Sequence, residues 1–236
     1  MARSAEASAR PKVTHHWFTA GLLLLTASTG AIDAVSYLAL DRVFTGNMTG
    51  NVLFIGFALV GVAGIPLLNN VTALVGFVLG SILGGRIVGR GHSDKLPRSS
   101  AWVLLSGGAL ALAIGIAWTI LGELPHGVLL AVTFVLAVVM GAQVSAVKPV
   151  GNSDITTIVV TNTLANLARD SRLGGGKGQP WAHRLLAVIA MGAGAAIGAG
   201  AINLWGGASA MFAAVIIYVA GTTTLIFANR HHRSVA

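Results

Sequence analysis

Six long apolar runs constrain the fold of this chain more than any other feature of its sequence. They cover residues 17–40, 71–88, 101–121, 127–147, 185–204 and 210–228. A helix needs about 20 mostly apolar residues to cross the hydrocarbon core of a bilayer, so each run is long enough to span a membrane. Only 9% of the residues are charged, whereas soluble domains have about 25%. We therefore predict an all-α integral membrane protein with about six transmembrane helices.

Two further apolar stretches, 48–68 and 155–168, are rich in polar residues. Most Lys and Arg residues lie in the two terminal tails and in the segments 86–98 and 169–184, and such basic segments mark the cytoplasmic side. If both polar stretches crossed the membrane, the segment 86–98 would lie outside. If only the six clear runs cross, every basic segment and both termini lie inside. We therefore predict two re-entrant helices in a multi-pass protein of a bacterial-type inner membrane.

This topology predicts an inverted 3+3 repeat. Each half holds three spans and one re-entrant segment, and because three is odd, the second half is inverted relative to the first. The predicted repeats cover 17–122 and 123–228, between cytoplasmic tails at 1–16 and 229–236. A weak internal similarity supports a duplication: Gly30-Ala31 is repeated at Gly141-Ala142, and Thr45 and Thr49 are echoed by Thr157 and Thr161. Inverted repeats with broken helices are typical of transporters.

The polar segment 41–51 contains Thr-Gly-Asn twice. Its string Phe-Thr-Gly-Asn-Met-Thr-Gly-Asn, together with the run Gly-Ala-Ile-Asp-Ala-Val-Ser-Tyr at 30–37, resembles the YoaK-like family of bacterial membrane proteins of unknown function. The resemblance continues at 141–143 and in the Thr-rich stretch 156–163. It implies a polytopic membrane protein of about six spans and supplies no substrate. An Asn usually follows the glutamine in that family, whereas Val144 does so here.

Non-helical backbone survives at membrane depth only where it is buried in protein or lines a wet cavity. We therefore predict that the two polar segments meet in a solute-binding site near the centre of the membrane. Two opposed helix N-termini favour an anion, a carboxylate or a water-like polar solute. One wall of the site would be Thr45, Gly46, Asn47, Thr49, Gly50 and Asn51, and the other wall Thr157, Thr161 and Asn162. Gln143 is a further candidate, since its uncharged amide could bond either the solute or the backbone. The alternative is an ordinary helix N-cap on an outer loop, with Asn47 and Thr49 facing water.

Asp33 is an acidic residue well inside a predicted span. A carboxylate at this depth is costly and is therefore a functional-site candidate. It could carry a coupling proton, ligate Na⁺, or accept hydrogen bonds from the N–H groups of the facing re-entrant tip. The structural alternative is a hydrogen bond to Ser36, Tyr37 or Asn47.

The sequence does not favour an enzyme, a metal site or a cofactor. The chain has no cysteine, which excludes disulfides and thiolate ligands. All of its histidines lie in tails or connections, and no catalytic pairing of side chains is evident within a span. The basic segments are separated by spans, so nucleic acid is not an expected partner.

Several spans carry glycines at small-xxx-small spacing, which lets helices approach closely. The spacing predicts either close packing within one chain or a homodimer interface through the glycine-rich helices. The residues concerned are Gly76, Gly80, Gly84, Gly194 and Gly198.

The predicted partners are therefore the lipid bilayer and a small polar or anionic solute. We predict a transport protein, either a channel or a secondary carrier, in which the solute passes between the two re-entrant tips. The alternative is a non-transporting scaffold or regulatory membrane protein whose polar motif is structural.

Overall fold

The computed structural model describes residues 12–90, 95–150, 157, 160–176 and 181–234. The described part is all-α, and six of its helices are long and apolar enough to cross a membrane, which confirms the predicted spans. These are α1 (Lys12–Ala39), α3 (Leu67–Val88), α4 (Arg98–Leu121), α5 (His126–Val147), α7 (Trp181–Trp205) and α8 (Gly207–Ser234). Shorter helices are α2 (Met48–Leu59), α6 (Val160–Arg169), η1 (Lys148–Val150) and η2 (Arg172–Gly174).

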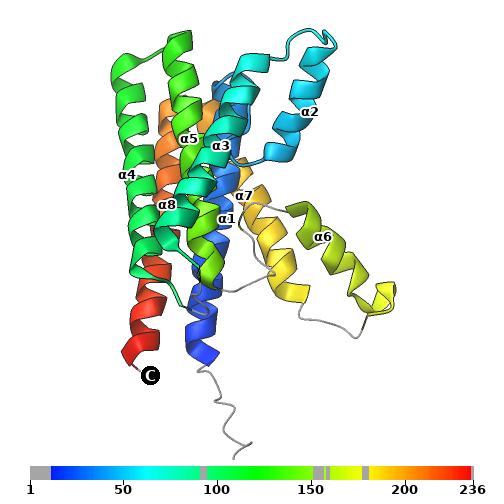
Figure 1. Cartoon of the computed structure of the whole chain (residues 1–236), viewed down its shortest axis with the longest axis vertical. Coiled ribbons are helices and arrows are strands. Elements are labelled where there is room, and N and C mark those ends of the chain that lie inside the picture. The colour runs from blue at the N-terminus through cyan, green and yellow to red at the C-terminus, as the bar shows by residue number, and fades with distance from the viewer. Residues whose placement is uncertain (1–11, 91–94, 151–156, 158–159, 177–180, 235–236) are drawn as a thin grey trace, which may run out of the picture.

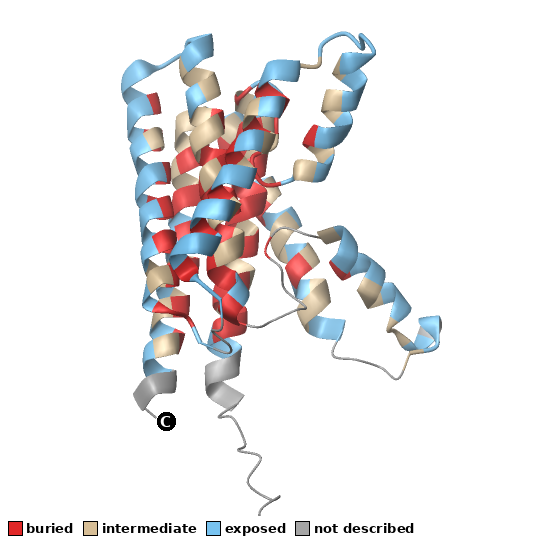
Figure 2. Ribbon diagram, in the orientation of Figure 1, coloured by how far each residue is buried: buried red, intermediate tan, exposed pale blue. Residues whose placement is uncertain are grey.

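The long helices form a bundle around α1 and α5. Helix α1 packs against α7 and α8, α5 packs against α3 and α4, and α4 also contacts α8. Buried residues concentrate on α1 and on the helix faces turned toward it (Figure 2). The outer faces expose large apolar side chains such as Ile82, Trp102 and Ile216. Apolar outer faces are what a bundle surrounded by lipid requires, since lipid cannot satisfy polar groups.

Glycines bring two pairs of long helices into close contact. A Cβ added at Gly194 of α7 would overlap the carbonyl oxygen of Ala27 on α1, and one at Gly80 of α3 would overlap that of Val138 on α5. The other glycines of the predicted spacing, Gly76, Gly84 and Gly198, are also buried against a neighbouring helix. The structure therefore uses these glycines for packing within the chain, and none of them is open to a second copy.

The two short helices lie on the same side of the bundle (Figure 1). Helix α2 has 12 residues and packs against α3, whereas α6 has 10 residues and packs against α7. Both begin part-way along the bundle, and they run toward opposite ends of it. They overlap the predicted polar segments 48–68 and 155–168, but α2 ends at Leu59, α3 already begins at Leu67, and α6 runs to Arg169. Residues 155, 156, 158 and 159 lie outside the described part of the chain.

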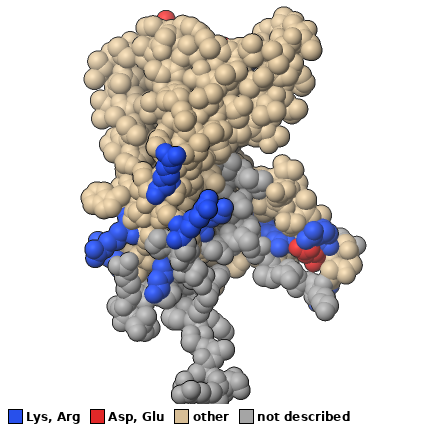
Figure 3. All heavy atoms as spheres, in the orientation of Figure 1, with Lys and Arg blue, Asp and Glu red and all other residues tan. Residues whose placement is uncertain are grey.

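Helix α1 begins and α8 ends at the same end of the bundle (Figure 1). Both helices extend past the predicted span boundaries, since α1 begins at Lys12 and α8 continues to Ser234. In the face shown in Figure 3, the Lys and Arg side chains lie toward this same end, and the opposite part of that face carries none. The distribution matches the positive-inside pattern from which the topology was predicted.

Candidate functional site

A loop between α1 and α2 folds back onto the side chain of Asp33. The Oδ1 atom of Asp33 accepts hydrogen bonds from the backbone N–H groups of Thr45, at 3.1 Å, and Gly46, at 2.7 Å. The side chain is buried, with 7% of the residue exposed. Of the roles predicted for Asp33, the structure therefore contains the bond to the facing loop. The alternative hydrogen bond between the Asp33 carboxylate and Ser36 is not formed, because the Ser36 hydroxyl donates to the backbone carbonyl of Asp33 instead.

Gly46 lets the loop lie close to α1 at this contact. A Cβ at this position would lie 3.0 Å from Cγ2 of Thr29 and 3.2 Å from each carboxylate oxygen of Asp33. Both distances are shorter than ordinary van der Waals contact, so a larger residue would require Thr29 or Asp33 to shift by a few tenths of an ångström. The close approach also places Thr29 beside the loop.

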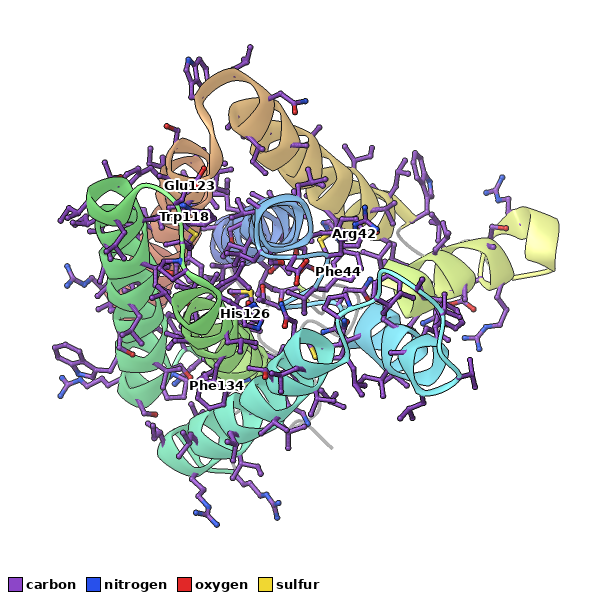
Figure 4. The ribbon with its side chains drawn as sticks, turned by 90° about the horizontal axis from the view of Figure 1, so that it is seen from above. Arg42, Phe44, Trp118, Glu123, His126 and Phe134 are labelled. Atoms are coloured by element: carbon purple, nitrogen blue, oxygen red, sulfur yellow. The ribbon has the colours of Figure 1, made fainter. Side chains whose placement is uncertain are left out.

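Asn51 holds the loop from its other end. Its Nδ2 donates to the carbonyl of Phe44, at 2.6 Å, and its Oδ1 accepts from the N–H of the same residue, at 3.0 Å. The ring of Phe44 stacks on Tyr37 of α1, with centroids 4.8 Å apart. Figure 4 shows Phe44 beside α1, between it and α2. The amide of Asn51 is thus engaged in positioning the loop.

Asn47 and Thr49 are exposed at the start of α2. The Oδ1 atom of Asn47 accepts a hydrogen bond from the N–H of Gly50, at 3.4 Å, which makes Asn47 the N-cap of α2. Asn is a favoured residue at this position because its side chain satisfies a free N–H of the first turn. This geometry matches the alternative in which the motif starts with an ordinary capped helix.

Gln143 of α5 lies next to Thr29, beside the loop that contacts Asp33. It is fully buried, and its Nε2 donates to the hydroxyl of Thr29, at 3.1 Å. That hydroxyl in turn donates to the carbonyl of Leu25, at 3.0 Å. Sequence analysis missed Thr29, although it precedes Asp33 by four residues and therefore lies on the same face of the helix. Thr29, Asp33, Thr45, Gly46 and Gln143 form what we call the central polar cluster.

Two buried atoms of the cluster lack hydrogen-bond partners. They are Oγ1 of Thr45 and Oε1 of Gln143, for which no partner exists among the described residues. Most buried polar atoms in proteins are paired with protein or with ordered water. The cluster thus retains hydrogen-bonding capacity that the chain itself does not use.

The residues of the predicted second wall are only partly brought near one another. Thr157 is buried with φ at +57°, and its Oγ1 has no partner among the described residues. Thr161 and Asn162 are exposed on α6. No hydrogen bond within the described part of the chain joins these three residues to the central polar cluster. The meeting of the two walls therefore stays a prediction.

Ionic contacts join the segment directly after α6 to the first turn of α7. The Nη1 atom of Arg184 donates to Oδ2 of Asp170, at 2.8 Å, and to the carbonyl of Asn166, at 2.9 Å. Hydrogen bonds from Arg169 and Arg184 hold the pKa of Asp170 below its ordinary value. Across the residues that the structure describes, no group of three or more His, Asp or Glu side chains could hold a metal ion.

Comparison with known proteins places the chain in a family. Residues 21–224 match the family described as "Protein of unknown function (DUF1275)". The chain belongs to the DUF1275 family. The matched region runs from within α1 to within α8, so it covers four of the six spans fully and the first and last in part, and it contains the whole central polar cluster. The resemblance to YoaK-like membrane proteins is thereby confirmed.

A relative of this DUF1275 protein is the UPF0700 transmembrane protein YoaK of Bacillus subtilis (strain 168). The two are 31% identical over 149 residues, which are 63% of this chain and 65% of the relative. The chain thus spans about 65% of the length of the curated relative that it matches. No solved structure matches the chain. The family and the six apolar helices make this DUF1275 chain a multi-pass membrane protein, and its function has to be argued from the site.

Proposed function

We propose that this protein transports a small polar solute across the membrane through the central polar cluster. The observation that supports the proposal is the pair of unpartnered buried atoms, Oγ1 of Thr45 and Oε1 of Gln143. Leaving a buried polar atom without a partner costs about 1–3 kcal/mol. Water or a passing solute with hydrogen-bonding groups would remove that cost.

The charges of the cluster favour a neutral solute over an anion. The loop N–H groups of Thr45 and Gly46 already bond Asp33, so they do not attract a further negative group. The carboxylate of Asp33 and the Oε1 of Gln143 are acceptors, and the carboxylate repels an anion strongly at low dielectric. Of the two predicted solute classes, we therefore favour a neutral solute that donates hydrogen bonds.

An inverted repeat with two re-entrant helices is the second part of the proposal. The helix contacts support it. If α1 to α4 are matched in order with α5 to α8, each contact made by one half has a counterpart. The α1–α7 contact matches α5–α3, the α1–α8 contact matches α5–α4, and the α2–α3 contact matches α6–α7. The glycines at the two matching interfaces also occupy equivalent positions. Gly30 of α1 corresponds to Gly141 of α5, and Gly194 and Gly198 of α7 correspond to Gly80 and Gly84 of α3. Helices α2 and α6 are also too short to span, since about 20 residues are needed. Such architectures place the substrate between the two repeats.

This register makes the two halves of the site chemically different. Asp33 corresponds to Val144, and Gln143 corresponds to Ile32. The first half thus contributes a carboxylate, and the second contributes an uncharged amide. Under the proposal, Asp33 would be the group that couples a proton or ion if the protein is a carrier.

A pair of isosteric variants tests the proposal. Thr45→Val removes the buried hydroxyl that has no partner among the described residues. Thr26→Val is the control, because the hydroxyl that it removes bonds only the carbonyl of Leu22 in the same helix. Protein in liposomes would be exposed to gradients of glycerol, urea or acetate, with entry followed by stopped-flow light scattering. We expect faster entry of glycerol or urea than in protein-free liposomes, and a rate about tenfold lower for Thr45→Val. Thr26→Val should match the wild type.

The proposal fails if none of the three solutes enters faster than in protein-free liposomes, or if the two variants lose activity equally. That result would favour a non-transporting scaffold or regulatory protein. The engagement of Asp33 and Asn51 with the loop backbone supports this second candidate. If the protein is such a scaffold or regulator, Thr45→Val should be at least as stable as the wild type, and neither protein should transport the solutes.

A further inference from the structure

A basic pocket opens between the last turns of α3 and α5, and no residue of the central polar cluster is among its lining residues. Its volume is about 800 Å³, and its charged lining residues are Arg86 and Arg90 from the α3 end and Lys148 directly after α5. None of the three forms an ion pair within the described part of the chain. Three cations that have no ion-pair partner among the described residues and that line one cavity point to an anionic ligand.

Helix ends and membrane topology do not account for this arrangement. A cation in the last turn of a helix offsets its dipole, and basic loops orient a protein in the membrane. Neither the dipole effect nor the orientation effect requires the cations to line one cavity. Here residues from two helices line a common cavity, and the helices are fixed to each other at its edge. The hydroxyl of Ser81 donates to the carbonyl of Gly141, at 3.2 Å, and that of Ser145 donates to the carbonyl of Ser81, at 2.9 Å.

The apolar side of the pocket continues into an exposed apolar face of α3. Ile82 lines the cavity and is 45% exposed, and Leu83 and Ile87 continue an exposed apolar face along α3. The pocket therefore offers a cationic site next to a surface that acyl chains would cover. A free phosphate ion would satisfy only the first of these features.

We propose that this pocket binds an anionic phospholipid, with its phosphate between Arg86, Arg90 and Lys148 and an acyl chain along α3. Each Lys or Arg near an anionic membrane surface contributes about 1 kcal/mol, or about fivefold in affinity. A variant that removes one cation from each helix end should therefore bind the lipid about 30-fold more weakly. This inference does not depend on the proposed transport.

The test is a lipid titration of the full-length protein in detergent, read by native mass spectrometry. The pocket variant combines Arg86→Gln and Lys148→Gln. Its control combines Lys95→Gln and Arg172→Gln, which remove the same charge from exposed residues outside the pocket. The ligands are phosphatidylglycerol, phosphatidylcholine and inorganic phosphate. We expect the wild type and the control to prefer phosphatidylglycerol, and the pocket variant to lose about 30-fold in affinity for it.

Three results would overturn the proposal. Equal losses in the pocket variant and the control would mean that diffuse surface charge attracts the lipid. Equal affinity for phosphatidylcholine would mean that the cations do not select the headgroup. Binding of inorganic phosphate as tight as that of phosphatidylglycerol would identify a site for a free anion. If the double variant aggregates on size exclusion, Arg90→Gln alone replaces it, with an expected loss of about fivefold.

Discussion

Asp33 shows how one side chain makes non-helical backbone tolerable inside a membrane protein. The loop before α2 has N–H groups that no helix satisfies, and Asp33 accepts two of them. Hydrogen bonds to an ionised acceptor are stronger than neutral ones, which offsets part of the cost of placing a carboxylate at this depth. The residue therefore has a structural role that is separable from the proposed coupling role.

Two substitutions of Asp33 should separate these roles. Asp33→Asn retains a carbonyl oxygen for the N–H groups of Thr45 and Gly46, whereas Asp33→Ala leaves both without an acceptor. We expect Asp33→Ala to lower the free energy of unfolding by about 2–3 kcal/mol and Asp33→Asn by less. Unfolding in mixed micelles would measure both values. Under the transport proposal Asp33→Asn should nevertheless abolish coupled transport, and full coupled transport in this variant would contradict the coupling role.

At the scale of helices, glycine positions decide how closely the bundle packs. In lipid there is no hydrophobic driving force between helices, so association depends on van der Waals contact and on hydrogen bonds between them. The α1–α7 and α3–α5 interfaces obtain that contact because glycines allow backbone to lie against backbone. A single added methyl group at such a position has to separate the helices.

A matched pair on α7 tests this packing. A Cβ at Gly194 would overlap the carbonyl of Ala27, whereas a Cβ at Gly200 would meet nothing within 4 Å. We expect Gly194→Ala to destabilise the protein by about 1–3 kcal/mol. Gly200→Ala should be neutral or slightly stabilising, because Ala favours a helix over Gly by about 1 kcal/mol. Thermal unfolding of the purified variants in detergent would measure the difference, and equal Tm values would contradict the packing.

At the scale of the whole molecule, the six helices place their connections alternately at two ends. The segments before α3 and between α4 and α5 lie at one end, whereas α3 ends and α4 begins at the end where α1 begins and α8 ends (Figure 1). Arg86, Arg90, Lys95 and Arg98 border that second end. The basic residues therefore predict which end faces the cytoplasm.

Single cysteines test this orientation directly, since the chain has none of its own. Leu68→Cys and Glu123→Cys should react with an impermeant thiol reagent added outside cells. Lys95→Cys and Arg172→Cys should react only after the inner side is opened to the reagent. Labelling of position 95 from outside, with position 68 protected, would reverse the orientation. Cysteines at positions 47 and 161, labelled from the outside and from the inside, would show whether water reaches the start of α2 and the start of α6.

The sequence alone determined the features that depend on local composition. The length of each apolar run set the six spans, the polar segments marked where helices break, and the glycine spacing marked close contacts. The similarity around residues 30–51 identified the family. All of these follow from residues that are near one another in the chain.

Only the tertiary structure decided which polar groups meet. It paired Gln143 with Thr29, joined Asp33 to the loop backbone, engaged Asn51 with Phe44, and left Thr161 exposed. The physical reason is that such pairings depend on the rotation and register of each helix. A span that is apolar on all sides carries little periodicity to indicate which face points inward. The rotation is instead set by contacts such as Gly194 against Ala27, which join residues far apart in the sequence.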